Sequence, residues 1–61
     1  MYKVMKQYKY DWGGFVECFS GSLSECEKHF NELSSQGTKA KIVHIKVLFG
    51  SREKELIKKN Y

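Results

Sequence analysis

The fold is decided by residues 22–37, whose sequence is Ser-Leu-Ser-Glu-Cys-Glu-Lys-His-Phe-Asn-Glu-Leu-Ser-Ser-Gln-Gly. Ser22 and Glu25 have the spacing of a capping box, in which the hydroxyl accepts from the backbone N–H three residues on and the carboxylate reaches back. Apolar residues follow at intervals of three and four, which places them on one helical stripe: Leu23, Cys26, Phe30 and Leu33. Gly37 stands where a left-handed C-terminal cap belongs. We therefore expect a helix over residues 23–35.

The segment before this helix is rich in Tyr, Phe and Val and is interrupted by the pair Gly13-Gly14. Paired glycines supply the positive φ angles that a tight chain reversal needs. We expect a β-hairpin in which residues 2–10 pair with residues 15–20. With an even-numbered loop, one face of this hairpin would carry most of its rings together with Val4: Tyr2, Val4, Tyr8, Tyr10, Phe15 and Phe19.

β-branched residues return from Thr38 to Phe49, which predicts the longest strand of the protein. Beyond Gly50, Ser51 has the character of a helix cap, and residues 52–59 then form a short C-terminal helix, with a frayed tail as the alternative. The expected fold is α+β, a ββαβ arrangement with a three-stranded sheet, one packed helix and a short C-terminal helix, in a single domain over residues 1–61. The sequence leaves open whether the third strand pairs parallel or antiparallel.

A chain of 61 residues and 7.2 kDa has a marginal core, because small domains bury a small share of their surface. One helix covers only one face of such a sheet. The other face must be covered by the C-terminal segment, covered by a second subunit, or left open for a ligand.

The net charge of +4 suits an acidic partner, either nucleic acid or protein. Among the basic residues Arg52 is the single arginine, which disfavours sequence-specific reading of DNA. The N-terminus lacks the apolar core of a signal peptide, and no apolar stretch is long enough to span a membrane. We expect a cytoplasmic protein without a membrane partner.

Four residues have the ligand types of a zinc site: Cys18, Cys26, His29 and His44. Because the chain has no CxxC knuckle, we interpret the cysteines as free thiols, and the reducing cytoplasm disfavours a Cys18–Cys26 disulfide. No nucleophile elbow, phosphate-binding loop or HExxH motif is present in the sequence, and a chain this short has little material to hold catalytic groups in place. We expect no enzyme, no cofactor and no metal.

The hairpin carries the residues that we assign to partner binding: Lys6, Tyr8, Lys9, Tyr10 and Trp12. Trp12, at the hairpin tip, is poorly placed to reach its own core, and exposed tryptophans are enriched among binding hot spots. Alternatively, rings interleaved with lysines stack the bases of single-stranded nucleic acid, or they complete the core or a dimer interface. For a homodimer we assign the apolar residues Phe15, Phe19, Leu56 and Ile57.

Residues 1–10, the Asp11-Trp12-Gly13-Gly14 turn and the Ser-rich cap before a Glu/Lys helix resemble the tiny single-domain proteins carried by phages of low-GC Gram-positive bacteria. Among these, the sequence is similar in character to proteins that block anti-phage defence, such as the small inhibitor of the Hachiman system and some anti-CRISPR proteins. The resemblance implies a compact homodimer that acts by binding. Its expected function is to occlude a site on a host anti-phage defence protein, with single-stranded nucleic-acid binding as the alternative.

We predict that Trp12→Ala abolishes partner binding and leaves the fold intact, since the side chain is expected to lie at a loop tip. A pull-down compares the variant with the wild type, and circular dichroism controls for folding. Unchanged binding would remove Trp12 from the contact surface.

Overall fold

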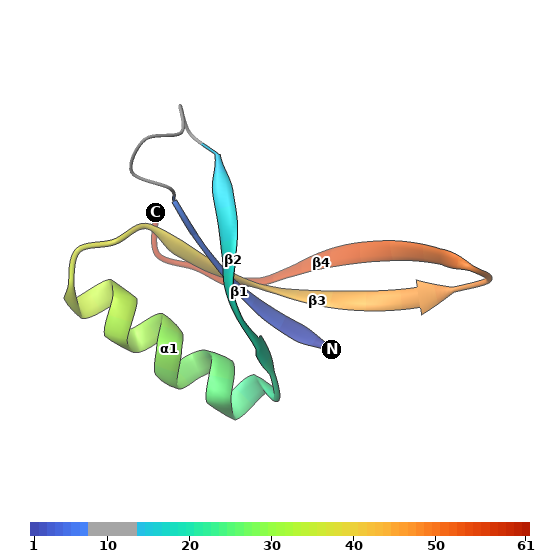
Figure 1. Ribbon diagram of the computed structural model, residues 1–61, viewed down its shortest axis with the longest axis horizontal. Coiled ribbons are helices and arrows are strands. Elements are labelled where there is room, and N and C mark those ends of the chain that lie inside the picture. The colour runs from blue at the N-terminus through green and yellow to red at the C-terminus, as the bar shows by residue number, and fades with distance from the viewer. Residues whose placement is uncertain (8–13) are drawn as a thin grey trace.

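The computed structural model describes residues 1–7 and 14–61 and shows an α+β fold with one helix on a four-stranded antiparallel sheet (Figure 1). In chain order the elements are β1 Tyr2–Gln7, β2 Phe15–Gly21, α1 Leu23–Ser35, β3 Ala40–Leu48 and β4 Ser51–Lys59. The strand order in the sheet is β2-β1-β3-β4, so β1 and β3 are central and β2 and β4 are the edges. The pairing that the sequence left open is thus antiparallel at every step.

Helix α1 begins and ends where the sequence predicts. Ser22 is the N-cap, and its Oγ accepts from the Glu25 N–H and donates to the Glu25 carboxylate. At the other end Gly37 has a φ of 77°, and backbone bonds run from Gly37 N to Ser34 O and from Thr38 N to Leu33 O. This pair of bonds is the Schellman motif, which satisfies carbonyls that the helix leaves free.

The core lies between α1 and the central strands. Its fully buried or nearly buried members are Val4, Cys26, Phe30, Ala40 and Ile42, with Tyr2, Phe19, Leu23 and Leu33 packed around them. The predicted helical stripe therefore faces the sheet. Both histidines stack on rings at the margin of this layer, with ring centroids 4.1 Å apart for His29 and Phe19 and 4.4 Å apart for His44 and Tyr2.

A β-bulge in the first hairpin changes the predicted faces. Val4 pairs with Phe19, but Met5 already pairs with Glu17, so β2 holds one extra residue at this point. Phe19 consequently lies on the α1 side, whereas Phe15 pairs with Gln7 and contacts Lys41 and Tyr61 on the opposite side. The expectation that both phenylalanines share one face is wrong, because simple alternation does not account for the extra residue.

The predicted short C-terminal helix is also wrong, since the chain from Ser51 to Lys59 forms β4 and makes a fourth strand. A two-residue turn, Phe49-Gly50, joins it to β3, and both residues have positive φ, 49° and 83°. Turns with positive φ at both central positions match the right-handed twist of paired strands. Gly50 therefore closes a hairpin here and does not separate a strand from a helix.

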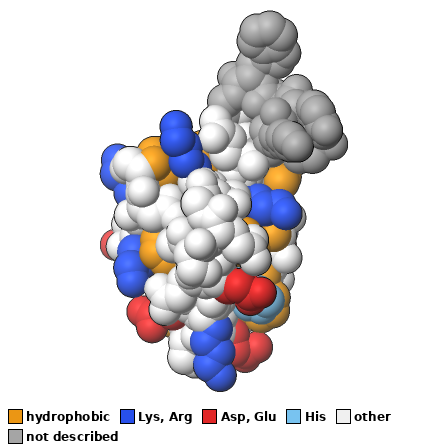
Figure 2. Space-filling view, turned by 90° about the vertical axis from the view of Figure 1, so that its left-hand side faces the viewer, with side chains coloured by type: hydrophobic (Ala, Val, Ile, Leu, Met, Phe, Trp, Pro, Cys, Tyr) orange, Lys and Arg blue, Asp and Glu red, His pale blue; other side chains and the backbone are white. Residues whose placement is uncertain are grey.

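The β3–β4 hairpin extends beyond the rest of the molecule (Figure 1). The last backbone contact of β3 with the N-terminal segment is the bond from Ile45 N to Met1 O, so within the described part of the chain residues 46–53 pair only with each other. We call residues 46–53 the arm. At the other end of the molecule, where α1 leads into β3, basic, acidic and apolar side chains are interspersed (Figure 2).

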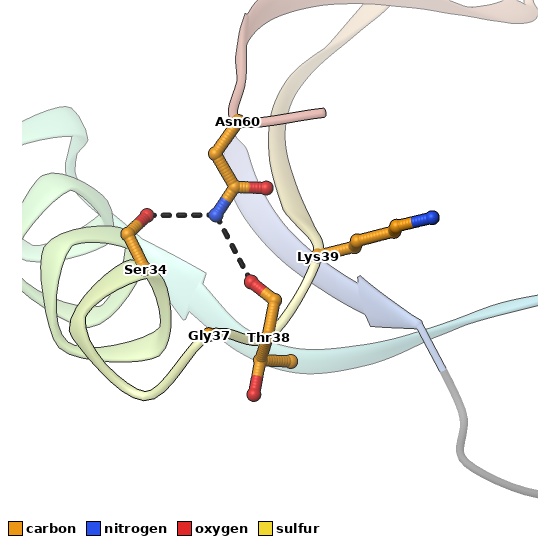
Figure 3. Close-up of a pocket in the computed structure, with 5 residues that line it drawn as sticks. All are labelled: Ser34, Gly37, Thr38, Lys39 and Asn60. Atoms are coloured by element: carbon orange, nitrogen blue, oxygen red, sulfur yellow. Dashed lines mark hydrogen bonds between the residues drawn. The ribbon is translucent and has the colours of Figure 1, made fainter.

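Asn60 ties the chain end to the body of the fold. Its Oδ1 accepts from the buried Ala40 N–H at 2.8 Å, and its Nδ2 donates to Ser34 Oγ at 2.7 Å and Thr38 O at 3.0 Å (Figure 3). The residues around it line a shallow depression of about 330 Å³. This one side chain thus joins the end of α1, the loop after it and the end of β4.

We predict that Asn60→Ala lowers the free energy of unfolding by about 1–3 kcal/mol, because it leaves the buried Ala40 N–H without its acceptor. Urea titration followed by circular dichroism measures the change. Asn31→Ala, on the exposed surface of α1, is the matched control and should change stability by less than about 0.5 kcal/mol. Equal effects of the two variants would show that Asn60 does not tie the chain end.

Candidate functional site

The face of the sheet opposite α1 is left uncovered by the elements that the structure describes. Cross-strand register assigns its side chains, because paired residues point to the same side of a sheet. We call this side the open face; it carries Lys3, Met5, Phe15, Glu17, Lys41, Val43, Ile45, Val47, Arg52, Lys54, Leu56 and Lys59. Val43 is nevertheless 95% buried, because Lys3 and Leu56 flank it on the neighbouring strands.

The open face holds a charge equal to that of the whole chain. Five cations and one carboxylate, Glu17, lie on it, which leaves a formal charge of +4. The other charged residues of the described segments cancel: Lys6, Lys28, Lys39, Lys46 and Lys58 against Glu25, Glu27, Glu32, Glu53 and Glu55. The modest net charge of the sequence is therefore concentrated on one side of the molecule.

Two aromatic rings and two lysines gather at one end of the open face. The rings of Phe15 and Tyr61 lie 5.3 Å apart and are tilted by 33°. The Lys41 ammonium is 4.5 Å from the centre of the Phe15 ring, and the Lys59 ammonium is 5.3 Å from that of Tyr61. A cation over a ring face is attracted by the ring quadrupole, so each lysine is held near an apolar surface.

A groove lies at the other end of the open face, beside the base of the arm. Its lining combines apolar and basic side chains and encloses about 390 Å³: Met1, Lys3, Ile45, Val47 and Arg52. Lys3 is also held by Glu17, with Nζ 3.0 Å from Oε2. The groove thus offers an apolar floor and cationic walls to whatever binds there.

The arm beyond this groove is apolar and exposed at its tip. Val47 is 68% exposed and the Phe49 side chain is fully exposed. On the α1 side of the hairpin, Lys46 forms an ion pair with Glu55. The hydrogen bond from Lys46 lowers the pKa of the Glu55 carboxyl and raises that of the Lys46 ammonium, so the pair is charged at neutral pH. The α1 side of the hairpin is thereby close to neutral while the open side is cationic.

Most of the residues assigned to partner binding from the sequence, namely Tyr8, Lys9, Tyr10 and Trp12, lie outside the described residues. Lys6 belongs to the α1 side, where it lines a hollow with Cys18 and His29. Among the residues assigned to a dimer, Phe15 and Leu56 lie on the open face, Ile57 is at a bulge of β4, and Phe19 packs on His29. The four residues assigned to a dimer therefore do not share one surface of the described fold.

Six cationic or aromatic members of the site were not assigned to it from the sequence: Lys3, Lys41, Arg52, Lys54, Lys59 and Tyr61. A signal for part of this set is visible in Arg52-Glu53-Lys54-Glu55, where cations and carboxylates alternate with a period of two. Such alternation is typical of a strand with one basic and one acidic side.

The cysteines lie on the α1 side and are both free. Cys26 is completely buried, and desolvation raises its thiol pKa above the ordinary value. Cys18 is exposed, but its Sγ donates to the Val4 carbonyl at 3.4 Å, and partial desolvation raises its thiol pKa as well. Within residues 1–7 and 14–61, no three side chains of His, Cys, Asp or Glu gather in a way that suits a metal ion.

Comparisons of the chain with protein-family models, with curated proteins and with solved structures found no match. In the segments that the structure describes, α1 is neither long nor apolar enough to cross a membrane. The geometry and charge of the open face are therefore the basis on which a function is assigned below.

We predict that iodoacetamide labels Cys18 in the native protein much faster than it labels Cys26, because only Cys18 is accessible. Since the pKa of each thiol is raised, both should react more slowly near neutral pH than an unperturbed cysteine, and labelling should accelerate as the pH rises. Peptide mass spectrometry after timed labelling measures both rates, and labelling in urea is the control. Equal native rates would contradict the burial of Cys26.

Proposed function

We propose that this protein is a non-enzymatic binding protein and that its contact surface is the open face. The observation that carries the proposal is the formal charge of +4 on the paired residues of the one side of the sheet that no described element covers. A cationic surface with an apolar floor suits a macromolecule whose own surface is acidic and partly apolar. The protein acts by covering that surface.

The charge also bears on self-association. Two copies packed through their open faces would bring two cationic surfaces together, which is electrostatically unfavourable. We therefore assign the open face to a different macromolecule. The homodimer expected from Phe15, Phe19, Leu56 and Ile57 stays a prediction.

We further propose that the partner is a protein, in keeping with the expected role as an inhibitor that occludes a host anti-phage defence protein. Exposed apolar residues stand beside the charges, notably Val47 in the groove and Leu56, which is 50% exposed. Mixed apolar and cationic surfaces of this kind are usual at the contact between two proteins. The cations then speed the encounter with an acidic target, and the apolar residues hold the complex.

Single-stranded nucleic acid is a second candidate, and a separate observation favours it. Phe15 and Tyr61 form a ring pair with Lys41 and Lys59 directly beside them. Rings that stack bases and lysines that contact phosphates are the parts of a sequence-tolerant single-strand site. This second function would use the same face as the first.

We predict that Lys54→Gln with Lys59→Gln weakens partner binding at least about tenfold, because both cations are lost from the open face. Lys28→Gln with Lys58→Gln removes the same charge from the α1 side, where Lys58 pairs with Ile42, and is the matched control. Nuclease-treated extracts of host cells are passed over each immobilised protein at physiological salt, and retained proteins are quantified by mass spectrometry. One host protein should be retained by the wild type and the control but lost by the open-face variant. Identical retention by both variants would overturn the assignment of the surface.

The wild type, the open-face variant and the control variant also test whether the partner is single-stranded nucleic acid. Fluorescence anisotropy of a labelled oligothymidine is recorded as salt is raised, because phosphate contacts release counterions and make the affinity fall steeply. Tight, salt-sensitive binding that depends on Lys54 and Lys59, without a retained host protein, would replace the protein partner with nucleic acid.

A further inference from the structure

The arm projects from the fold as an isolated two-stranded ribbon (Figure 1). Of the residues that the structure describes, 46–53 pair only with each other, since the pairing of β3 with β1 ends at His44 and its backbone bond to Met1 is at Ile45. None of the described elements therefore forms a second layer over the side chains at the tip. Ribbons of two strands are marginally stable in water, so a projecting one makes little contribution to the stability of the domain.

Phe49 at the tip is unfavourable for the isolated protein in two respects. Its φ of 49° lies in the left-handed region, which a bulky side chain adopts at a cost and which Gly, Asn and Asp adopt readily at this position of a turn. Its side chain is also fully exposed to water. Neither the turn nor the core benefits from a phenylalanine here, and strained residues of this kind cluster at functional sites.

We propose that the tip of the arm, centred on Phe49, inserts into an apolar pocket of the partner protein whose rim is acidic. The proposal rests on the proposed function and specifies its partner. Buried aromatic anchors surrounded by weaker contacts account for much of the affinity of protein interfaces. Arg52, three residues after Phe49, lies on the open side of the arm and lines the groove with Val47, so the cationic surface continues up to the tip.

The arrangement of charge favours a protein pocket over a lipid surface. An anionic bilayer would surround an inserted tip, yet the arm is cationic on one side only. On the other side Glu53 pairs with Lys46, which is itself bound to Glu55. A second copy of this chain is also a poor receptor, because the groove on its open face is lined by Lys3 and Arg52.

The variant Phe49→Asn distinguishes a loss of binding from a loss of folding, because the substitution should weaken binding while leaving the fold equally or more stable. The substitution creates an Asn-Gly pair, the preferred sequence for this turn, so the melting temperature should stay the same or rise by a few degrees, about 4 °C. Binding to the host protein retained by the wild type should fall at least about tenfold. Ile57→Asn, which removes an exposed apolar side chain from β4 away from the tip, should retain binding. Wild-type affinity of the Phe49→Asn variant for that host protein would overturn the proposal.

Photo-crosslinking in host cells tests the contact directly. p-Benzoylphenylalanine is incorporated in separate proteins in place of Phe49, of Lys54 on the open face and of Lys28 on α1, and the cells are irradiated. The same single host protein should be joined to the probes replacing Phe49 and Lys54, and not to the probe replacing Lys28. A crosslink from the Lys54 position alone overturns the insertion of the tip and leaves the proposed function standing, whereas crosslinks from neither position overturn both.

Two other outcomes have their own readouts. Sedimentation with vesicles of phosphatidylethanolamine and phosphatidylglycerol that requires Phe49 would assign the tip to a lipid surface and overturn the protein pocket. A covalent product of twice 7.2 kDa from the Phe49 position would assign it to a second copy and overturn the proposal in the same way.

Discussion

The contact of Phe30 and Cys26 with Val4 and Ile42 is the interaction on which the other features of the fold depend. It joins the single helix to the two central strands and fixes which side of the sheet is covered. Because α1 has only 13 residues, it covers the first half of β3 and does not extend beneath the arm. The open face and the projecting hairpin are thus consequences of a core that is small and lies on one side.

This one-sided core separates the molecule into parts with different tasks. The α1 side contains the buried thiol, the stacked histidines and charges that cancel, which are features of a stable layer. The open face contains the uncompensated cations, and the arm contains three exposed apolar side chains, those of Val47, Leu48 and Phe49. A change on the open face should therefore affect binding with little effect on folding, which is why charge-matched substitutions on the two sides are informative.

Local signals in the sequence predicted the elements whose structure depends on neighbouring residues. The capping box at Ser22 and the glycine at Gly37 predicted both ends of α1, and alternation of β-branched residues predicted β3. The C-terminal strand was missed because Glu55 and Lys59 also have helical spacing, and pairing with β3 across the turn decides between helix and strand. The bulge between Val4 and Met5 and the hydrogen bonds of Asn60 depend on tertiary contacts that no local pattern encodes. An open second face of the sheet was one of three possibilities that the sequence left, beside coverage by the C-terminal segment or by a second subunit. The identity of its residues could not be predicted, because it depends on how β4 pairs with β3.

The edge strand β4 has a further consequence for the behaviour of the chain at high concentration. An exposed strand of nine residues offers unpaired N–H and C=O groups to strands of other molecules, which is a route to aggregation. Six of its nine residues are charged: Arg52, Glu53, Lys54, Glu55, Lys58 and Lys59. Another copy of β4 paired in parallel and in register would set each of these charges beside its own kind, at a cost in free energy. The residues that make the surface attractive to an acidic partner therefore also disfavour parallel, in-register pairing of β4 between copies of this small protein.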